Sequence, residues 1–92
     1  MSEASADTQP DDVVPTAQAV LRHVVGALVK DPDAVRVETD TSSARPVLTV
    51  RVGSSDMGRV IGRRGRTAHA IRTVVRAAAA QDGSDVEVEF ED

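Results

Sequence analysis

The stretch GRVIGRRGRTAHAIRTVVRAAA, residues 58–79, decides how this 92-residue chain folds. Two glycines three positions apart, Gly62 and Gly65, separate a short apolar segment from a long one. Glycine permits positive φ and lets another backbone approach closely, so the pair predicts a sharp turn between two helices. The first helix ends before Gly62, and the second runs from Arg66 to about Ala80. The expected apolar face of the second helix consists of Ala68, Ile71, Val74, Val75, Ala78 and Ala79.

Positive charge is concentrated in the same part of the chain. The sequence has a net charge of −4, but residues 57–80 contain six arginines and no acidic residue. That segment therefore carries +6, which leaves −10 for the rest of the chain. Such an asymmetry indicates a local anion-binding surface. The alternative is a solvated helix face whose charge is balanced by acidic residues elsewhere in the fold.

The glycine turn has the chemistry of a phosphate site. Arg63 and Arg64 lie inside it, and Arg59 and Arg66 flank it. The turn points backbone amides and the N-terminus of the second helix at a ligand, and helix N-termini attract anions. A phosphodiester backbone is the natural ligand for this arrangement. Alternatively, the segment is an ordinary link between helices with solvated arginines.

Two further groups of side chains border the turn. His69, Arg72 and Arg76 are spaced i, i+3 and i+7, so they share one stripe of the long helix. The stripe either continues the basic surface or is the ordinary exposed face of an amphipathic helix. Of the apolar pair before the turn, Val60 and Ile61, one is expected in the core and the other beside a binding groove. An aliphatic side chain exposed there can serve nucleic acid or a protein partner.

The flanking sequence predicts one more helix and three strands. A helix begins near Pro15 and ends at Asp31-Pro32, because the residue before proline is pushed out of the helical region. Alternating apolar residues predict strands in AVRVETD, PVLTVRV and DVEVEFE. Asp56 or the serine before it is the candidate N-cap of the short helix, and Gly83 is the candidate C-cap of the long one.

These elements define an α+β fold in the order helix, strand, strand, helix, helix, strand. A three-stranded sheet is expected, covered on one face by three helices, with its middle and last strands parallel. Residues 1–15 are small, polar and acidic in the main, and they are expected to form a disordered tail. Residues 16–92 form the single predicted domain.

Composition narrows the classes of function. The chain has no cysteine and two histidines far apart in sequence, so neither a metal nor another cofactor is expected. Phe90 is the only aromatic residue, which argues against a stacking platform for bases. Glu87, Glu89 and Glu91 alternate along a strand and are expected to form a solvated face instead of a metal or acid–base cluster. Since no nucleophile–base pair is visible, neither an enzyme nor a small-molecule substrate is expected.

Localisation follows from what the sequence lacks. No apolar run approaches the roughly 20 residues that span a membrane, and the acidic N-terminus has no signal-peptide character. The expected compartment is the cytoplasm, with no membrane partner.

The motif VIGRRG followed by a long helix resembles the GXXG loop of a KH domain, which clamps about four nucleotides of single strand. The element order resembles the type II KH arrangement over about residues 16–91. The phrases DPDAVRVE and AIRTVVRAAA further resemble a family of small bacterial KH-domain RNA-binding proteins, the KhpA family. The residues expected to contact RNA are Arg59, Val60, Ile61, Gly62, Arg63, Arg64, Gly65, Arg66, His69 and Arg72.

The resemblance implies a function and partners. It implies a single-stranded RNA-binding protein, an RNA chaperone or post-transcriptional regulator, tied to cell-envelope and cell-shape control. It also implies pairing with a KhpB-like KH protein, and a homodimer is an open alternative. The alternative function is a protein–protein interaction module with a KH fold and little RNA affinity of its own. Single-stranded DNA stays open as a ligand, because a backbone clamp hardly excludes it.

Overall fold

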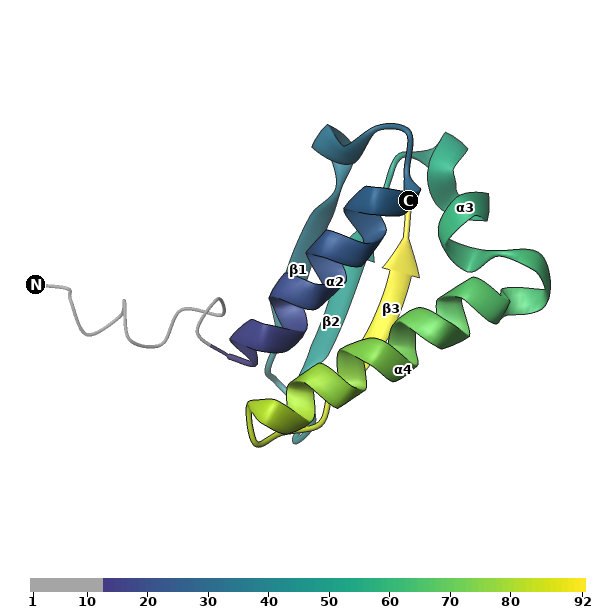
Figure 1. Ribbon diagram of the computed structural model, residues 1–92. Coiled ribbons are helices and arrows are strands. Elements are labelled where there is room, and N and C mark those ends of the chain that lie inside the picture. The colour runs from purple at the N-terminus through teal and green to yellow at the C-terminus, as the bar shows by residue number, and fades with distance from the viewer. Residues whose placement is uncertain (1–12) are drawn as a thin grey trace, which may run out of the picture.

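A computed structural model describes residues 13–92 of the chain. The order of elements is helix, strand, strand, helix, helix, strand, as the sequence predicts (Figure 1). Three-residue 3₁₀ turns join some of them. The main elements are α2 (Pro15–Leu28), β1 (Arg36–Asp40), β2 (Val47–Arg51), α3 (Met57–Ile61), α4 (Arg66–Gln81) and β3 (Glu87–Glu91).

The three strands form one mixed sheet in the order β1-β2-β3. β1 pairs antiparallel with β2, with Val37 opposite Val50, and β2 pairs parallel with β3, with Leu48 opposite Val88. A parallel pair needs a crossover connection, and the α3–loop–α4 segment supplies it. All three helices lie on one face of the sheet (Figure 1). The predicted α+β architecture and the parallel pairing are confirmed.

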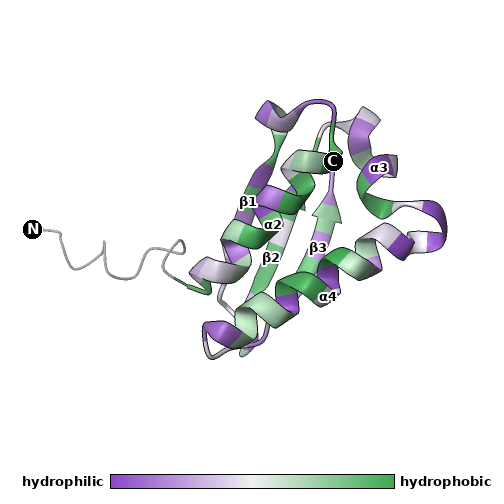
Figure 2. Cartoon of the chain, viewed as in Figure 1, coloured by the Kyte–Doolittle hydropathy of each residue, from purple (hydrophilic) through white to green (hydrophobic). Residues whose placement is uncertain are grey.

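The core lies between the sheet and the helices, where apolar residues recur along α2, β2 and α4 (Figure 2). Leu48 and Val50 of β2 and Leu21 of α2 are fully buried, as is Val75 of α4. Their spacing is two residues in the strand and three to four in the helices, which is why one face of each element meets the others. Burying each such side chain contributes about 1.5–3 kcal/mol of transfer free energy.

Val74 does not belong to the core, contrary to the sequence-based expectation. Its side chain is 49% exposed, whereas Val75, one position later, is completely buried. Consecutive residues of a helix are rotated by about 100°, so an apolar pair cannot point in one direction. Ile71 and Ala78 keep the core face, and Val74 lies to one side of it.

The carboxylate of Asp56 is buried and holds two segments together. It accepts hydrogen bonds from the backbone N–H groups of Lys30 (3.0 Å) and Asp31 (3.1 Å) and from Nε of Arg59 (3.1 Å). Asp56 occupies the N-cap position of α3, but its side chain makes no capping bond there. The predicted N-cap hydrogen bond is therefore absent, because the carboxylate bonds the segment that follows α2 instead of the first turn of α3. The Lys30 N–H lowers the pKa of Asp56 more than burial raises it.

The C-terminus of α4 forms a glycine cap as predicted. Gly83 has φ 76°, its N–H donates to the carbonyl of Ala80, and the N–H of Ser84 donates to that of Ala79. This is the Schellman arrangement, which satisfies carbonyls left over at a helix end. Asp82, the residue before Gly83, contacts the start of the first helix. Its carboxylate accepts hydrogen bonds from two backbone N–H groups in the first turn of α2.

The outer face of the sheet is polar and rich in carboxylates. Arg51 of β2 pairs with Glu91 of β3 at 2.9 Å and with Glu38 of β1 at 3.4 Å. Arg45 pairs with Glu87 at 3.5 Å, and each of these side chains is more than two-fifths exposed. The predicted solvated face is thus present. Within residues 13–92, no group of carboxylates and histidines has an arrangement that could hold a metal ion.

The folded domain begins slightly earlier than the sequence predicts. Val14 is only 4% exposed and joins the core, and α2 starts at Pro15. Most of the predicted tail, residues 1–12, lies outside the described residues. Among the helices of residues 13–92, none is long and apolar enough to cross a membrane.

Candidate nucleic-acid interface

The backbone of the glycine loop is held in conformations that most residues avoid. Gly62 has φ 75° and ψ 174°, Arg64 has φ 58° and ψ 25°, and Gly65 has φ 73° and ψ 13°. Glycine adopts positive φ without penalty, but arginine in the left-handed region is strained by about 1–2 kcal/mol. Backbone strain of this kind concentrates at functional sites.

The loop stands in front of the N-terminus of α4. The first turn of this 16-residue helix receives no capping hydrogen bond from any side chain of the described region. The N–H of Arg66 donates to the carbonyl of Arg63, so the N–H groups that follow it, together with the helix dipole, form the positive end of α4. An anion bound at the loop therefore meets backbone donors as well as arginines.

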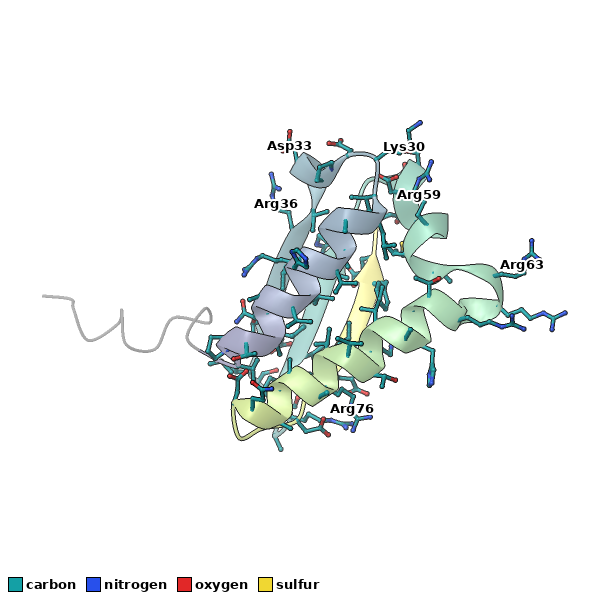
Figure 3. The ribbon with its side chains drawn as sticks, in the orientation of Figure 1. Lys30, Asp33, Arg36, Arg59, Arg63 and Arg76 are labelled. Carbon is teal, nitrogen blue, oxygen red and sulfur yellow. The ribbon has the colours of Figure 1, made fainter. Side chains whose placement is uncertain are left out.

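The arginines around the loop differ in whether they are already paired. Arg63, Arg64 and Arg66 form no ion pair or hydrogen bond with other side chains in the described part of the protein. Arg63 projects from the tip of the loop, away from the body of the domain (Figure 3). These three guanidinium groups are therefore available to a ligand.

Arg59 and Arg76 are committed to acidic partners. Arg59 pairs with the buried carboxylate of Asp56, although its own side chain is 48% exposed. Arg76 forms two bonds of 2.9 Å with Asp85, and Arg45 adds a third at 3.2 Å. The Arg76 hydrogen bond holds the pKa of Asp85 far below its usual range, and the same contact raises the pKa of Arg76. The positive charge of Arg76 is thus offset by Asp85, which weakens the basic stripe predicted along α4.

A groove of about 880 Å³ runs between α4 and β3. His69, Arg72 and Arg76 line it from α4, so the structure brings the predicted stripe to one surface. The opposite wall consists of Val86, Glu87, Val88 and Glu89, and Arg45 with Asp85 borders the groove near the end of α4.

Val60 and Ile61 differ in burial: the predicted contact of Val60 with RNA is wrong, and the place of Ile61 beside a groove stays a prediction. Val60 is fully buried and belongs to the core, so it supports the loop without reaching a ligand. Ile61 is partly buried against the same core. Sequence reasoning did not find the roles of Arg45, Asp85 and Val88, because no local pattern marks residues that meet α4 only across the fold.

A GXXG loop between two helices, set against a three-stranded mixed sheet in this element order, defines a type II KH domain. The model of the family described as KhpA/KhpB, KH domain, matches residues 18–90. The chain belongs to this KhpA/KhpB KH-domain family.

Individual relatives agree with this assignment. RNA-binding protein KhpA of Leifsonia xyli is 53% identical over 72 residues, which cover 78% of this chain and 92% of that protein. RNA-binding protein KhpA of Bacillus subtilis is 44% identical over 70 residues, covering 76% and 86%. Among solved structures, Aquifex aeolicus Era matches with a TM-score of 0.57 at 15% identity, covering 86% of this chain and 30% of Era. That likeness shows the fold alone.

Proposed function

We propose that the protein binds single-stranded RNA and that the GXXG loop captures the phosphate backbone. The observation that carries the proposal is the set of unpaired arginines, Arg63, Arg64 and Arg66, beside the uncapped N-terminus of α4. Relatives named RNA-binding protein KhpA support RNA as the ligand. The proposal is for binding without catalysis.

Backbone capture at the loop accounts for affinity, and the groove accounts for the placement of bases. The N–H groups of Gly62 and Gly65 donate to the carbonyls of Gly58 and Gly62, so the arginine side chains of the loop supply the main donors to phosphate oxygens. Bases then lie along α4, between His69 and Arg72 on one side and β3 on the other. Affinity that depends on phosphate neutralisation falls steeply as salt rises.

We further propose that the domain works in a pair, with a second copy or with a KhpB-like KH protein. One KH domain holds only about four nucleotides, and linking two sites raises avidity through effective concentration. Val74, half exposed on α4, supports a protein contact on this helix. Action as an RNA chaperone or post-transcriptional regulator in the cytoplasm, and a link to cell envelope and shape, remain proposals taken from the family resemblance.

The same exposed valine favours the second candidate function, a protein–protein module with little RNA affinity. In that case α4 contacts its partner through Val74, and the arginine loop contributes only charge. The two functions differ in which substitutions abolish binding.

The test is fluorescence anisotropy with a labelled single-stranded RNA at several salt concentrations. The wild-type protein is compared with a variant carrying Arg63→Asp and Arg64→Asp, and circular dichroism checks that the variant folds. We expect salt-dependent binding by the wild type and none by the folded variant. Equal binding by both would remove the loop as the RNA clamp and turn attention to protein partners. A competition between matched RNA and DNA strands decides which nucleic acid is preferred.

A further inference from the structure

The free edge of the sheet forms one wall of the groove. Along β3, the N–H of Glu87 donates to Pro46 and the carbonyl of Glu91 accepts from Val52, so these residues face β2. Because backbone polar groups alternate in direction along a strand, those of Val88 and Phe90 face the groove instead. An open strand edge offers an N–H and a carbonyl side by side, one donor and one acceptor.

Arg72 covers this edge. Its Nε donates to the carbonyl of Val88 at 3.2 Å, and its guanidinium carbon lies 5.0 Å from the centre of the Phe90 ring. A planar guanidinium at that distance interacts favourably with the aromatic face. These two contacts, with Val88 and Phe90 of β3, therefore hold the guanidinium of Arg72 against the open edge of that strand.

The contact changes which groups a base encounters. Val88 is only 3% exposed, so its backbone is closed to a ligand, whereas Arg72 is itself an exposed residue. A guanidinium carries five N–H donors and no acceptor, and Nε uses one of them. At this position the groove therefore presents a fork of donors in place of the donor–acceptor pair of a bare strand edge.

We propose that Arg72 is a specificity-determining residue that makes the groove prefer guanine to adenine. Guanine offers two neighbouring acceptors, O6 and N7, which suit a guanidinium fork, whereas adenine offers an acceptor beside an amino donor. The strand-edge acceptor that the amino group of adenine would use is the carbonyl of Val88, and Arg72 already occupies it. This inference rests on the proposed RNA binding and deepens it.

The experiment measures base preference with short uridine-rich RNAs that differ only at one central position, which is guanine, adenine or 7-deazaguanine. The last of these lacks the N7 acceptor. For the wild type we expect guanine to bind at least about fivefold more tightly than adenine, and 7-deazaguanine to lose most of that advantage. Arg72→Ala uncovers the strand edge, so we expect the ratio of the affinity for the guanine RNA to that for the adenine RNA to fall to one or below.

Two variants separate specificity from charge. Arg72→Lys keeps the positive charge but not the fork, so we expect retained salt dependence with a reduced guanine preference. Arg63→Ala changes the loop and not the groove, so we expect it to weaken the binding of all three RNAs by the same factor. Thermal unfolding confirms that each variant folds.

The outcomes distinguish the inference from the proposed function. If the wild type binds RNA with a salt slope but treats guanine and adenine alike, or prefers adenine, the role of Arg72 is overturned while the RNA-binding proposal stands. An unchanged preference in Arg72→Ala likewise overturns it. If the wild type binds none of the RNAs, both proposals fail.

Discussion

Thr67 occupies the space that a side chain at Gly62 would need. A Cβ atom built on Gly62 would lie 2.6 Å from Cβ of Thr67, 3.0 Å from its backbone nitrogen, and closer still to its Oγ1. Position 62 therefore requires glycine for two reasons: its φ is 75°, and the first turn of α4 leaves no room for a side chain. Gly65 shares the positive φ, but nothing lies within 4 Å of its own added Cβ.

The two glycines should therefore respond differently to alanine. We expect Gly62→Ala to destabilise the fold by about 1–3 kcal/mol and to weaken RNA binding, because both the backbone and Thr67 must shift. Gly65→Ala, the matched control, incurs only the backbone strain of about 1 kcal/mol. Urea denaturation measures the free energy of unfolding of both variants. Equal losses for the two variants would contradict the assigned role of Thr67.

Arg64 is expected to trade stability for binding. It is strained at φ 58°, and glycine relieves that strain while making the unfolded chain more flexible. Arg64→Gly should therefore leave the free energy of unfolding unchanged or raise it by up to about 1 kcal/mol. The same variant should bind RNA more weakly, as anisotropy would measure. A stable variant with undiminished affinity would mean that the Arg64 side chain contacts no phosphate.

The salt dependence of RNA binding counts the arginines in contact with phosphate. Replacing Arg63 or Arg66 by alanine should reduce the slope of log affinity against log salt by about 0.7 each, the value for one phosphate on a single strand. Arg22→Ala on α2 is the control, because its guanidinium bonds Gln18 within that helix. An equal change in slope for Arg22→Ala would point to net charge instead of local contact.

Acid should weaken the fold through Asp56 and Asp85. Hydrogen bonds hold the pKa of each carboxyl below its ordinary value of 3.8, so both groups stabilise the folded state above that value. That stabilisation is lost as pH falls below 3.8 toward the folded-state pKa values, since the unfolded chain then binds protons more readily. Asp56→Asn removes one titrating group and should flatten the decline of unfolding free energy measured at decreasing pH. An unchanged acid slope would exclude Asp56 as a contributor.

Asp82 links the two ends of the domain. Its carboxylate accepts hydrogen bonds from the N–H groups of Thr16 (3.0 Å) and Ala17 (3.2 Å), at the start of α2. Asp82→Ala should therefore cost about 1 kcal/mol, the usual loss for a helix cap. Asp82→Asn keeps a side-chain oxygen and should cost less in the same denaturation experiment. Identical losses would show that charge matters more than the acceptor.

The sequence predicted the elements of this fold because each one depends on local rules. Period-two alternation marks β2, glycine marks both ends of the loop, and Gly83 marks the end of α4. The loop arginines were also predictable, since they lie within the motif itself. The direction of Val74 was not, because hydrophobicity alone does not separate neighbouring positions on a helix.

The contacts that shape the site were beyond such rules. Arg72 meets Val88 across 16 positions, and Asp56 meets the backbone of Lys30 across 26. These pairs depend on how helices and strands pack, which a single sequence does not encode in any short pattern. The same holds for Arg76, whose positive charge is offset by pairing with Asp85 across nine positions of the chain.

Under the proposed function, the separation of charge between the arginine loop and the acidic outer face of the sheet governs the outcome of collisions with RNA. At physiological salt, fields fade within about 8 Å, so a strand responds to the surface it meets and not to the net charge of −4. On that proposal, strands that approach the acidic outer face are repelled, and those that arrive at the loop are retained. The domain then selects encounters by orientation, because only one part of its surface attracts the phosphate backbone.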